Sequence, residues 1–290
     1  MKLWTRVAVS FLALAFAVGL AASPADAASK KSKKETKKES KKEVKKETRH
    51  ETRHSSGSKR FITGTNTIGR AGLFFGDTSD VAAVGQVEGS AHLTYWSFGP
   101  SGYATTDIGL PVGAHFGVAK NLDLSGAIIL NFISVPSVTV PGFGTVGGGS
   151  TTNFALDLGG KYRIAGGSKS PDFSIGGDIM VPTQTGGQVI VSPRGVVSYT
   201  LESGLLLNGD VAINISSATY ASFDGGVGVP VGSNLSIIGE IGANQSGNGG
   251  SMLGGGVRAD LSGIKLQGLL GIPLNGGGVQ LGGGIVLASN

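Results

Sequence analysis

Residues 107–132 carry the clearest pattern in the chain and read DIGLPVGAHFGVAKNLDLSGAIILNF. From Ile108 to Val118 every second side chain is apolar, and Gly, Pro or His stands between them. Residues 119–121 interrupt the pattern, and alternation resumes at Leu122 with the same period of two. This period is typical of a β-strand, because successive side chains point to opposite faces. The stretch therefore predicts two strands joined by a tight turn, each with one apolar face.

The same alternation continues in both directions along the chain. Eleven such segments lie between Asp107 and the end, and a twelfth, residues 86–96, precedes them. The sequence thus predicts an all-β fold of about 12 antiparallel strands. Two architectures fit this pattern: a soluble sandwich or barrel with the apolar faces inside, and a transmembrane β-barrel with the apolar faces outside.

The links between the predicted strands favour the membrane barrel. Odd-numbered links are mostly long, such as 97–104 and 133–152, and even-numbered links are mostly tight turns, such as 119–121 and 262–263. Long loops at one end and short turns at the other are typical of outer-membrane barrels. An even strand count places both ends of residues 84–290 on the short-turn, periplasmic side.

Two stretches carry a resemblance to a known class of protein: DIGLPVGAHFGVAKNLDLSGAIILNF and FALDLGGKYRIAGGSKSPDFSIGGDIMV. Their pattern resembles that of bacterial outer-membrane β-barrels of the porin-like kind, over about residues 84–288. No motif points to a specific family. The resemblance implies an antiparallel transmembrane β-barrel, contact with outer-membrane lipid, and insertion by the barrel-assembly machinery.

The first 27 residues have the features of an export signal. Lys2 and Arg6 precede an apolar stretch that ends near Ala22, and Ala25 and Ala27 fit a small-residue cleavage pattern. The apolar stretch is shorter than the ~20 residues that a spanning helix needs. We therefore expect a signal peptide at 1–27 and export to the bacterial outer membrane.

The basic charge of the chain is confined to residues 28–60. This segment contains 14 Lys and Arg against five Glu, whereas residues 61–290 carry eight basic and 13 acidic side chains. Repeats such as KKET and KKES stack like charges at i,i+4, so we expect a disordered periplasmic tail. It is either a solvated spacer or a tether to the cell wall or anionic phospholipid. Nucleic acid is a poor candidate, because no aromatic interleaves the lysines. Residues 61–83 fit a linker, an extra strand or a plug equally well.

The residue types argue against catalysis and cofactors. The chain has no cysteine, which removes disulfides, thiol chemistry and cysteine metal sites. Its glycine-rich run at 225–228 leads into a strand rather than a helix, so it is no phosphate loop. His92 and His115 have no marked nucleophile beside them. We therefore expect a protein that is not an enzyme and holds no metal or cofactor, with its 51 glycines serving tight turns and close strand packing.

The predicted inner face carries more acids than bases. Lipid-facing charge costs about 2–4 kcal/mol at the bilayer midplane, so charged side chains on these strands should point inward. The resulting candidates for lumen-facing residues are Glu88, Asp107, His115, Asp123, Asp157, Lys161, Arg163, Asp178, Arg194, Asp210, Asp224, Glu240, Arg258, Asp260 and Lys265. Two interpretations follow. The barrel is either a passive channel for small polar solutes or ions with mild cation preference, or a structural or surface-interaction barrel with a filled lumen.

Overall fold

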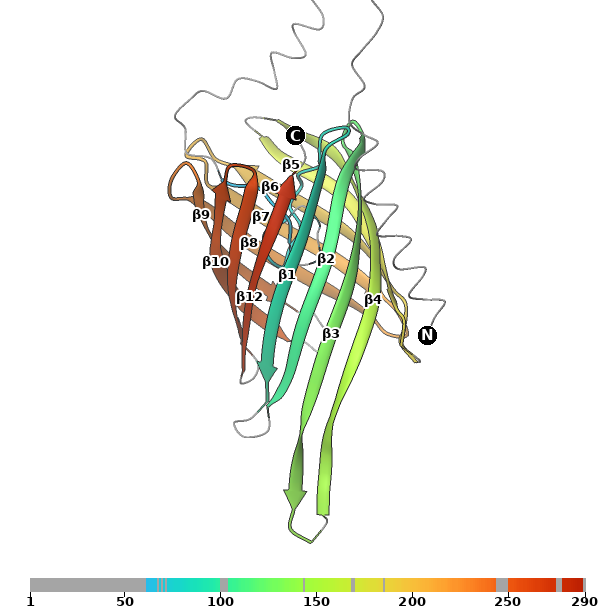
Figure 1. Ribbon diagram of the computed structural model, residues 1–290. Helices are drawn as coiled ribbons and strands as arrows, with labels where there is room; N and C mark the ends of the chain where they lie inside the picture. The colour runs from blue at the N-terminus through green and yellow to red at the C-terminus, as the bar shows by residue number, and fades with distance from the viewer. Residues whose placement is uncertain are drawn as a thin grey trace, which may run out of the picture. The chain divides into compact units, whose positions relative to one another are not determined.

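The alternating segments form twelve antiparallel strands that close into one barrel (Figure 1). The computed structural model describes residues 61–66, 68, 70, 72–99, 104–142, 144–167, 170–184, 186–243, 250–274 and 278–288. The strands are β1 (Val87–Phe98), β2 (Thr105–Ala119), β3 (Leu122–Val140), β4 (Gly144–Gly167), β5 (Ser170–Pro182), β6 (Ile190–Thr200), β7 (Leu206–Ile215), β8 (Thr219–Pro230), β9 (Leu235–Ala243), β10 (Ser251–Leu261), β11 (Ile264–Pro273) and β12 (Gly278–Ala288). The predicted fold class and strand number are confirmed.

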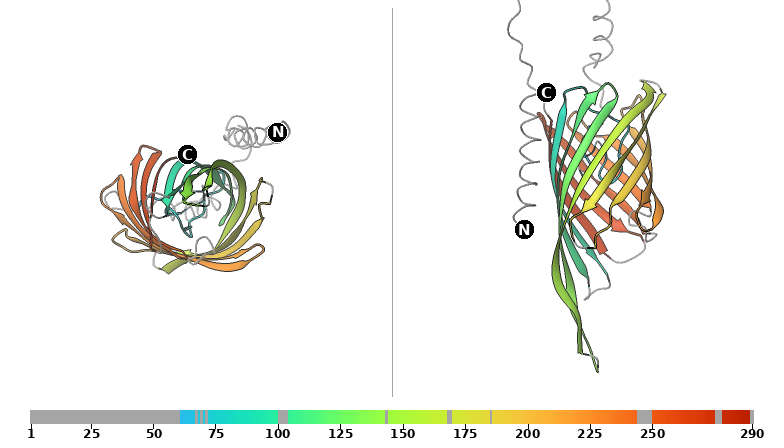
Figure 2. Two further views of the ribbon diagram at one scale, coloured as in Figure 1. Left: turned by 90° about the horizontal axis from the view of Figure 1, so that it is seen from below. Right: turned by 90° about the vertical axis from the view of Figure 1, so that its right-hand side faces the viewer.

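Closure of the sheet comes from pairing between the first and last strands. Each strand pairs with its neighbour in the chain, and β1 pairs with β12 from Glu88 opposite Ala288 to Phe98 opposite Gly278. Seen along its axis, the sheet forms a ring (Figure 2, left). Each strand thus has a neighbour on both sides within the ring, which is the condition for a sheet to span hydrocarbon.

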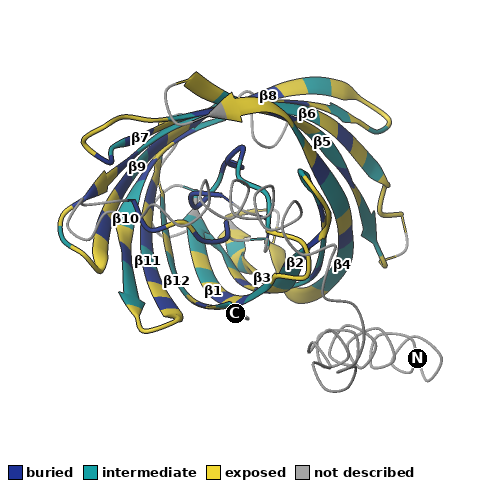
Figure 3. Ribbon diagram, turned by 90° about the horizontal axis from the view of Figure 1, so that it is seen from above, coloured by how far each residue is buried: buried dark blue, intermediate teal, exposed yellow. Residues whose placement is uncertain are grey.

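Side-chain exposure is inverted relative to a soluble protein. Large apolar side chains such as Ile108, Leu158 and Ile241 are exposed, while polar ones such as Asp123, Asp157 and Glu240 are buried. Exposed and buried residues alternate along the strands (Figure 3). The apolar faces therefore form the outside of the barrel, and the soluble arrangement with an apolar interior does not apply. No described residue belongs to a helix long and apolar enough to cross a membrane.

The predicted difference between the two ends of the barrel is present, with one correction. Residues 133–152 were expected to form a long Gly/Pro-rich loop, but they extend β3 and β4 into a hairpin that projects beyond the other strands (Figures 1 and 2). Pairing continues from Ile133 opposite Thr151 to Val140 opposite Gly144. The turn is tight because Gly142 and Gly144 adopt φ values of 82° and 83°, which favour glycine. The predicted signal peptide and tail, 1–60, lie outside the described residues.

The hairpin and the barrel wall should respond differently to the same substitution. Val257 lies in the middle of β10 and is 48% exposed, and Val146 lies in the projecting hairpin and is 57% exposed. In lipid vesicles, Val257→Arg should lower the free energy of unfolding by about 2–4 kcal/mol, because the charge meets hydrocarbon. Val146→Arg should cost about 0–1 kcal/mol, because the hairpin is longer than a membrane-spanning strand requires. Denaturant titration measures both, and equal costs would contradict the assignment of the lipid-facing band.

Candidate functional site in the barrel lumen

The lumen is occupied by the residues that precede the first strand. We call residues 61–83 the plug; Figure 3 shows it inside the ring of strands. Its side chains Leu73, Phe74 and Asp77 are buried, and the described residues 61–86 form only two isolated bridges, Gly72 with Asp77 and Val84 with Gly117. The segment is therefore not a thirteenth strand of the sheet and not a solvated linker. The described residues have the arrangement of a plug, which is one of the three alternatives that the sequence leaves open.

Asn66 organises the turn at the start of the plug. Its side-chain oxygen accepts hydrogen bonds from the backbone N–H groups of Ile68 at 3.1 Å and Arg70 at 3.0 Å. Its side-chain nitrogen donates to the Asp77 carboxylate at 2.7 Å, and its backbone N–H donates to the Arg70 carbonyl at 2.7 Å. One amide side chain thus joins the two halves of the plug, because Asn can accept and donate at once.

Arg258 on β10 holds the plug through its backbone carbonyls. Its guanidinium is completely buried and donates to the carbonyl oxygens of Ile62, Thr65, Gly72 and Leu73 at 3.0–3.2 Å. A fifth bond, at 2.9 Å, goes to the Gln267 side-chain oxygen. The rings of two plug residues flank the group, with centroids 5.8 and 5.7 Å from the guanidinium carbon. This planar, fork-shaped donor thus satisfies several plug carbonyls that would otherwise be buried without a partner.

Glu240 on β9 holds the plug through its backbone N–H groups. The buried carboxylate accepts from Phe74 at 2.9 Å, from Phe75 at 3.2 Å and from Gly76 at 3.2 Å. Three successive amides therefore point at one anion. Arg258 thus binds carbonyl groups of the plug, and Glu240 binds the N–H groups at residues 74–76. Both wall residues bind the plug through its backbone.

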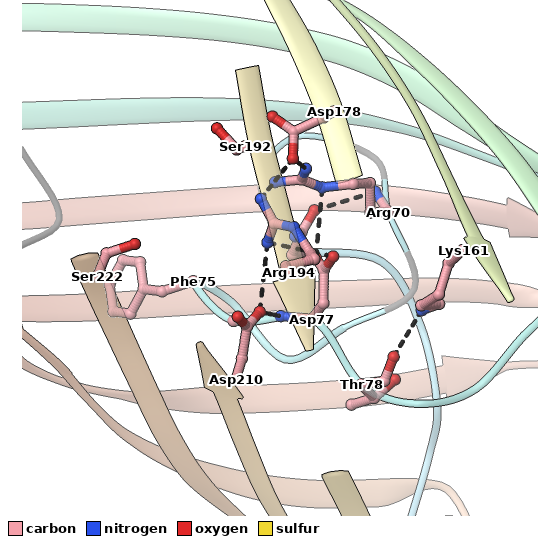
Figure 4. A network of polar contacts seen from close by, with 12 residues as sticks. Arg70, Phe75, Asp77, Thr78, Lys161, Asp178, Ser192, Arg194, Asp210 and Ser222 are labelled. Carbon is pink, nitrogen blue, oxygen red and sulfur yellow. Dashed lines mark hydrogen bonds and ion pairs between the residues drawn. The ribbon is translucent and has the colours of Figure 1, made fainter. Parts of the chain in front are cut away.

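A cluster of charged side chains joins the plug to β5, β6 and β7 (Figure 4). Arg70 lies 3.3 Å from Asp77 within the plug and bonds Asp178 on β5. Arg194 on β6 contacts Asp77 at 3.3 Å, Asp178 at 2.5 Å and Asp210 at 3.3 Å. Burial disfavours the charged form of Asp77, but the two guanidiniums outweigh burial and hold the pKa of its carboxyl below the usual value. Three carboxylates thus share two guanidiniums.

Glycines on the inner face make room for the plug's large side chains. A β-carbon added at Gly228 would lie 2.3 Å from the ring of Phe61, and one at Gly254 would lie 2.3 Å from the ring of Phe75. At Gly226 the added carbon would lie 2.3 Å from Leu73. Non-bonded carbons prefer about 3.5–4.0 Å, so a side chain at any of these positions requires the plug side chain beside it to move. We call Gly226, Gly228 and Gly254 the glycine cradle.

The structure brings many of the predicted lumen-facing residues together around the plug. Those in contact with it are Asp123, Lys161, Asp178, Arg194, Asp210, Glu240 and Arg258. Lys161, for example, donates to the Thr78 carbonyl at 2.5 Å.

A second group lies on β1, β2 and β11. Glu88 contacts His115 at 3.3 Å and Lys265 at 2.6 Å, and His115 lies 3.4 Å from Asp123.

The other predicted residues have different surroundings. Arg163 donates to the Asn121 side chain at 3.3 Å, and Asp260 accepts from the Gly263 N–H at 3.0 Å, both beside short turns. Asp107 lies on β2 opposite Trp96 and Ile133. Asp157 and Asp224 line a cavity of about 250 Å³.

This cavity lies between the plug and the long-link end of the barrel. Ile190 at the start of β6, Asn214 near the end of β7 and Tyr220 near the start of β8 line it on one side, and Arg70 and Phe75 of the plug line it on the other. The described residues hold no group of three or more His, Asp or Glu placed to bind a metal ion. The described plug residues thus occupy one part of the lumen, and the cavity lies on their long-link side.

Sequence reasoning missed the plug's own residues, Arg70, Asp77 and Asn66, and the glycine cradle. The available signal was weak. Residues 61–83 lack the period of two but are rich in glycine and aromatic residues, and they stand between a charged tail and the first strand.

Comparisons with known proteins agree with the architecture. The sequence matches no protein-family model, and no curated protein matches it. Among solved structures, the KdgM porin superposes with a TM-score of 0.51 at 8% identity, over 69% of this chain and 99% of that chain. The KdgM porin in complex with disordered oligogalacturonate gives a TM-score of 0.50 at 8% identity, with the same coverage. At this identity the likeness concerns the fold alone: the chain has the fold of outer-membrane β-barrel porins.

Proposed function

We propose that this protein is an outer-membrane channel for small polar solutes or ions, with mild cation preference, whose lumen is closed by residues 61–83. The observation that carries the proposal is the way the plug is attached. Wall side chains such as Arg258 and Glu240 bind its backbone, and its described residues share no strand with the sheet, so its only covalent link to the wall is the chain that leads into β1. A segment held in this way can move out of the lumen while the pairing between β1 and β12 stays intact.

The apolar part of the plug interface is small. The buried apolar cluster consists of Phe61, Leu73, Phe74, Leu206, Ile238 and Leu269. Most other plug contacts are hydrogen bonds and ion pairs with charged side chains, which contribute about 1.5–3 kcal/mol each and whose donors and acceptors water can serve once they separate. These features support a removable closure better than a permanent core.

Cation preference is supported by the wall that would remain after the plug leaves. The wall residues predicted to face inward comprise nine acids and five bases. When the plug leaves the lumen, its described residues remove one base, Arg70, and two acids, Asp77 and Asp80. Rings of acidic side chains in a water-filled pore favour cations. Passive permeation of this kind involves no catalytic step.

The location of the protein and the role of its tail belong to the same proposal. We place the short-turn end, where β1 begins and β12 ends, in the periplasm. Residues 1–27 act as the signal peptide, and residues 28–60 lie in the periplasm, where their basic charge suits the cell wall or anionic phospholipid. Partners are then outer-membrane lipid and the barrel-assembly machinery, with no nucleic acid.

A second candidate is a structural or surface-interaction barrel with a permanently filled lumen. The observation that favours it is the complete burial of Arg258 with its five hydrogen bonds. The two candidates differ in one measurable property, because only the first allows current through a barrel whose plug is displaced.

Enlarging the glycine cradle should open the channel. In planar bilayers, Gly228→Val and Gly254→Leu should give discrete conductance steps more often and for longer than the wild type, because the new side chains occupy the space of Phe61 and Phe75. Gly195→Val is the matched control, since no atom lies within 4 Å of a β-carbon at that outward position. Folded cradle variants that remain electrically silent would exclude the channel.

The open state should prefer cations. Under a salt gradient, the reversal potential of Gly254→Leu should show cation selectivity, because the wall keeps its acid excess when Arg70 is displaced. Replacing Asp178 and Asp210 by Asn in that background should reduce the selectivity. An anion-selective reversal potential would refute the charge argument while leaving the channel itself intact.

Loss of Arg258 should free the plug. The chain has no cysteine, so Ser79→Cys, at a buried plug position, introduces a single thiol. Arg258→Met in this background should raise the rate of thiol labelling by a charged reagent about tenfold or more, because each unpaired buried carbonyl costs about 1–3 kcal/mol. Arg163→Met should leave the rate unchanged, since Arg163 bonds Asn121 in a turn. Equal rates in all three proteins would show that Arg258 does not retain the plug.

A further inference from the structure

The cavity between the plug and the long-link end has a divided lining. Four carboxylates, on Asp157, Asp178, Asp210 and Asp224, face it together with the guanidiniums of two arginines. Apolar side chains complete the wall: Ile68, Phe75, Ile129, Met180 and Ile190. A volume of about 250 Å³ corresponds to roughly eight waters at ~30 Å³ each, which is room for a short organic molecule.

The two arginines of the cavity are already engaged. Arg70 contacts Asp77 and Asp178, and Arg194 contacts Asp77, Asp178 and Asp210. These five groups carry three negative charges and two positive ones. The net charge of the cluster is therefore negative, so it repels an anion that enters the cavity and attracts a cation.

Asp157 forms none of the ion pairs of this cluster. It is only 2% exposed, and its buried Oδ1 has no hydrogen-bond partner among the described residues. Its direct neighbours across the sheet are Ala127 on β3 and Met180 on β5, which have no donor to offer from their side chains. Burying a carboxylate without a hydrogen-bond donor costs free energy. A ligand that brings a cationic donor to Asp157 would therefore be stabilised there.

We infer that the cavity binds a short aliphatic amine, with the ammonium group at Asp157 and the carbon chain against the apolar side of the lining. The aromatic rings of Phe75 and Tyr220, both in the lining, suit an ammonium group, which is attracted to ring faces. The inference deepens the proposed function by naming a solute class, and it rests on that function only in so far as the bound amine is also the solute that crosses.

A matched set of ligands tests the inference on the wild-type protein with its plug in place. Calorimetric titration in detergent should show saturable binding of butylamine. The uncharged 1-butanol and the anionic butyrate also have four carbons and should show none. Absence of butylamine binding to folded protein overturns the inference, and so does equal binding of the alcohol.

Matched variants locate the site. Asp157→Asn should weaken butylamine binding about tenfold or more, which is the effect of losing one charge-assisted hydrogen bond. Asp107→Asn removes another inward carboxylate outside the cavity lining and should leave binding unchanged. Undiminished binding in Asp157→Asn, or equal loss in both variants, overturns the assignment to this cavity.

Failure of this inference and failure of the channel proposal give different results. Amine binding is measured with the lumen closed, whereas conductance is measured in the cradle variants. Conductance without amine binding leaves the channel and removes the amine site. Binding without conductance in any variant leaves the site and removes the channel.

Discussion

The constraint on which the whole molecule depends is that a sheet in hydrocarbon must leave no backbone group without a partner. Only a closed ring satisfies this, so β12 must return to β1, as the pairing from Glu88 to Phe98 shows. Closure in turn separates two environments that every strand meets at alternate residues. Large apolar side chains such as Ile108 and Ile241 face lipid, and the charged ones have only the lumen left.

The charged side chains that line the lumen then need hydrogen-bond and ion-pair partners inside the barrel. In a twelve-stranded barrel the wall side chains do not meet across the centre, and the plug supplies much of what they lack. Arg258 finds carbonyls, Glu240 finds amides, and Arg194 finds the Asp77 carboxylate. The wall adapts in return, because the glycine cradle omits the side chains that the plug replaces. Wall and plug are therefore complementary in polarity and in volume, although they are separate parts of the chain.

The barrel could be predicted from sequence, whereas the site could be predicted only in part. Period-two alternation reports which face of a strand a residue occupies, so inward residues such as Asp178 and Glu240 could be named. It does not report which inward residues meet, since that depends on the register of the strands and on what fills the lumen. The plug escapes such reasoning for a physical reason. Its backbone is held by single side chains such as Arg258 and Asn66. Neither the turn around Asn66 nor the position of Arg258 on its strand produces a repeating pattern in the sequence that would reveal this contact. The hairpin at 133–152 was missed for another reason, because its prolines and glycines resemble a loop, yet they stand where the ladder tolerates them.

The number of polar contacts around the plug is compatible with the proposed removable closure. A hydrogen bond in hydrocarbon is worth several kcal/mol, because nothing replaces it when it breaks. Inside a barrel with a hollow of about 250 Å³ beside the plug, water can take over each donor and acceptor as it is released. The cost of moving the plug is then concentrated in a few places that water serves badly: the buried guanidinium of Arg258, and the rings of Phe61 and Phe74 that flank it. The same lumen polarity that favours a plug is therefore compatible with the proposed removal of the plug, and the attachment is strongest where water has least access.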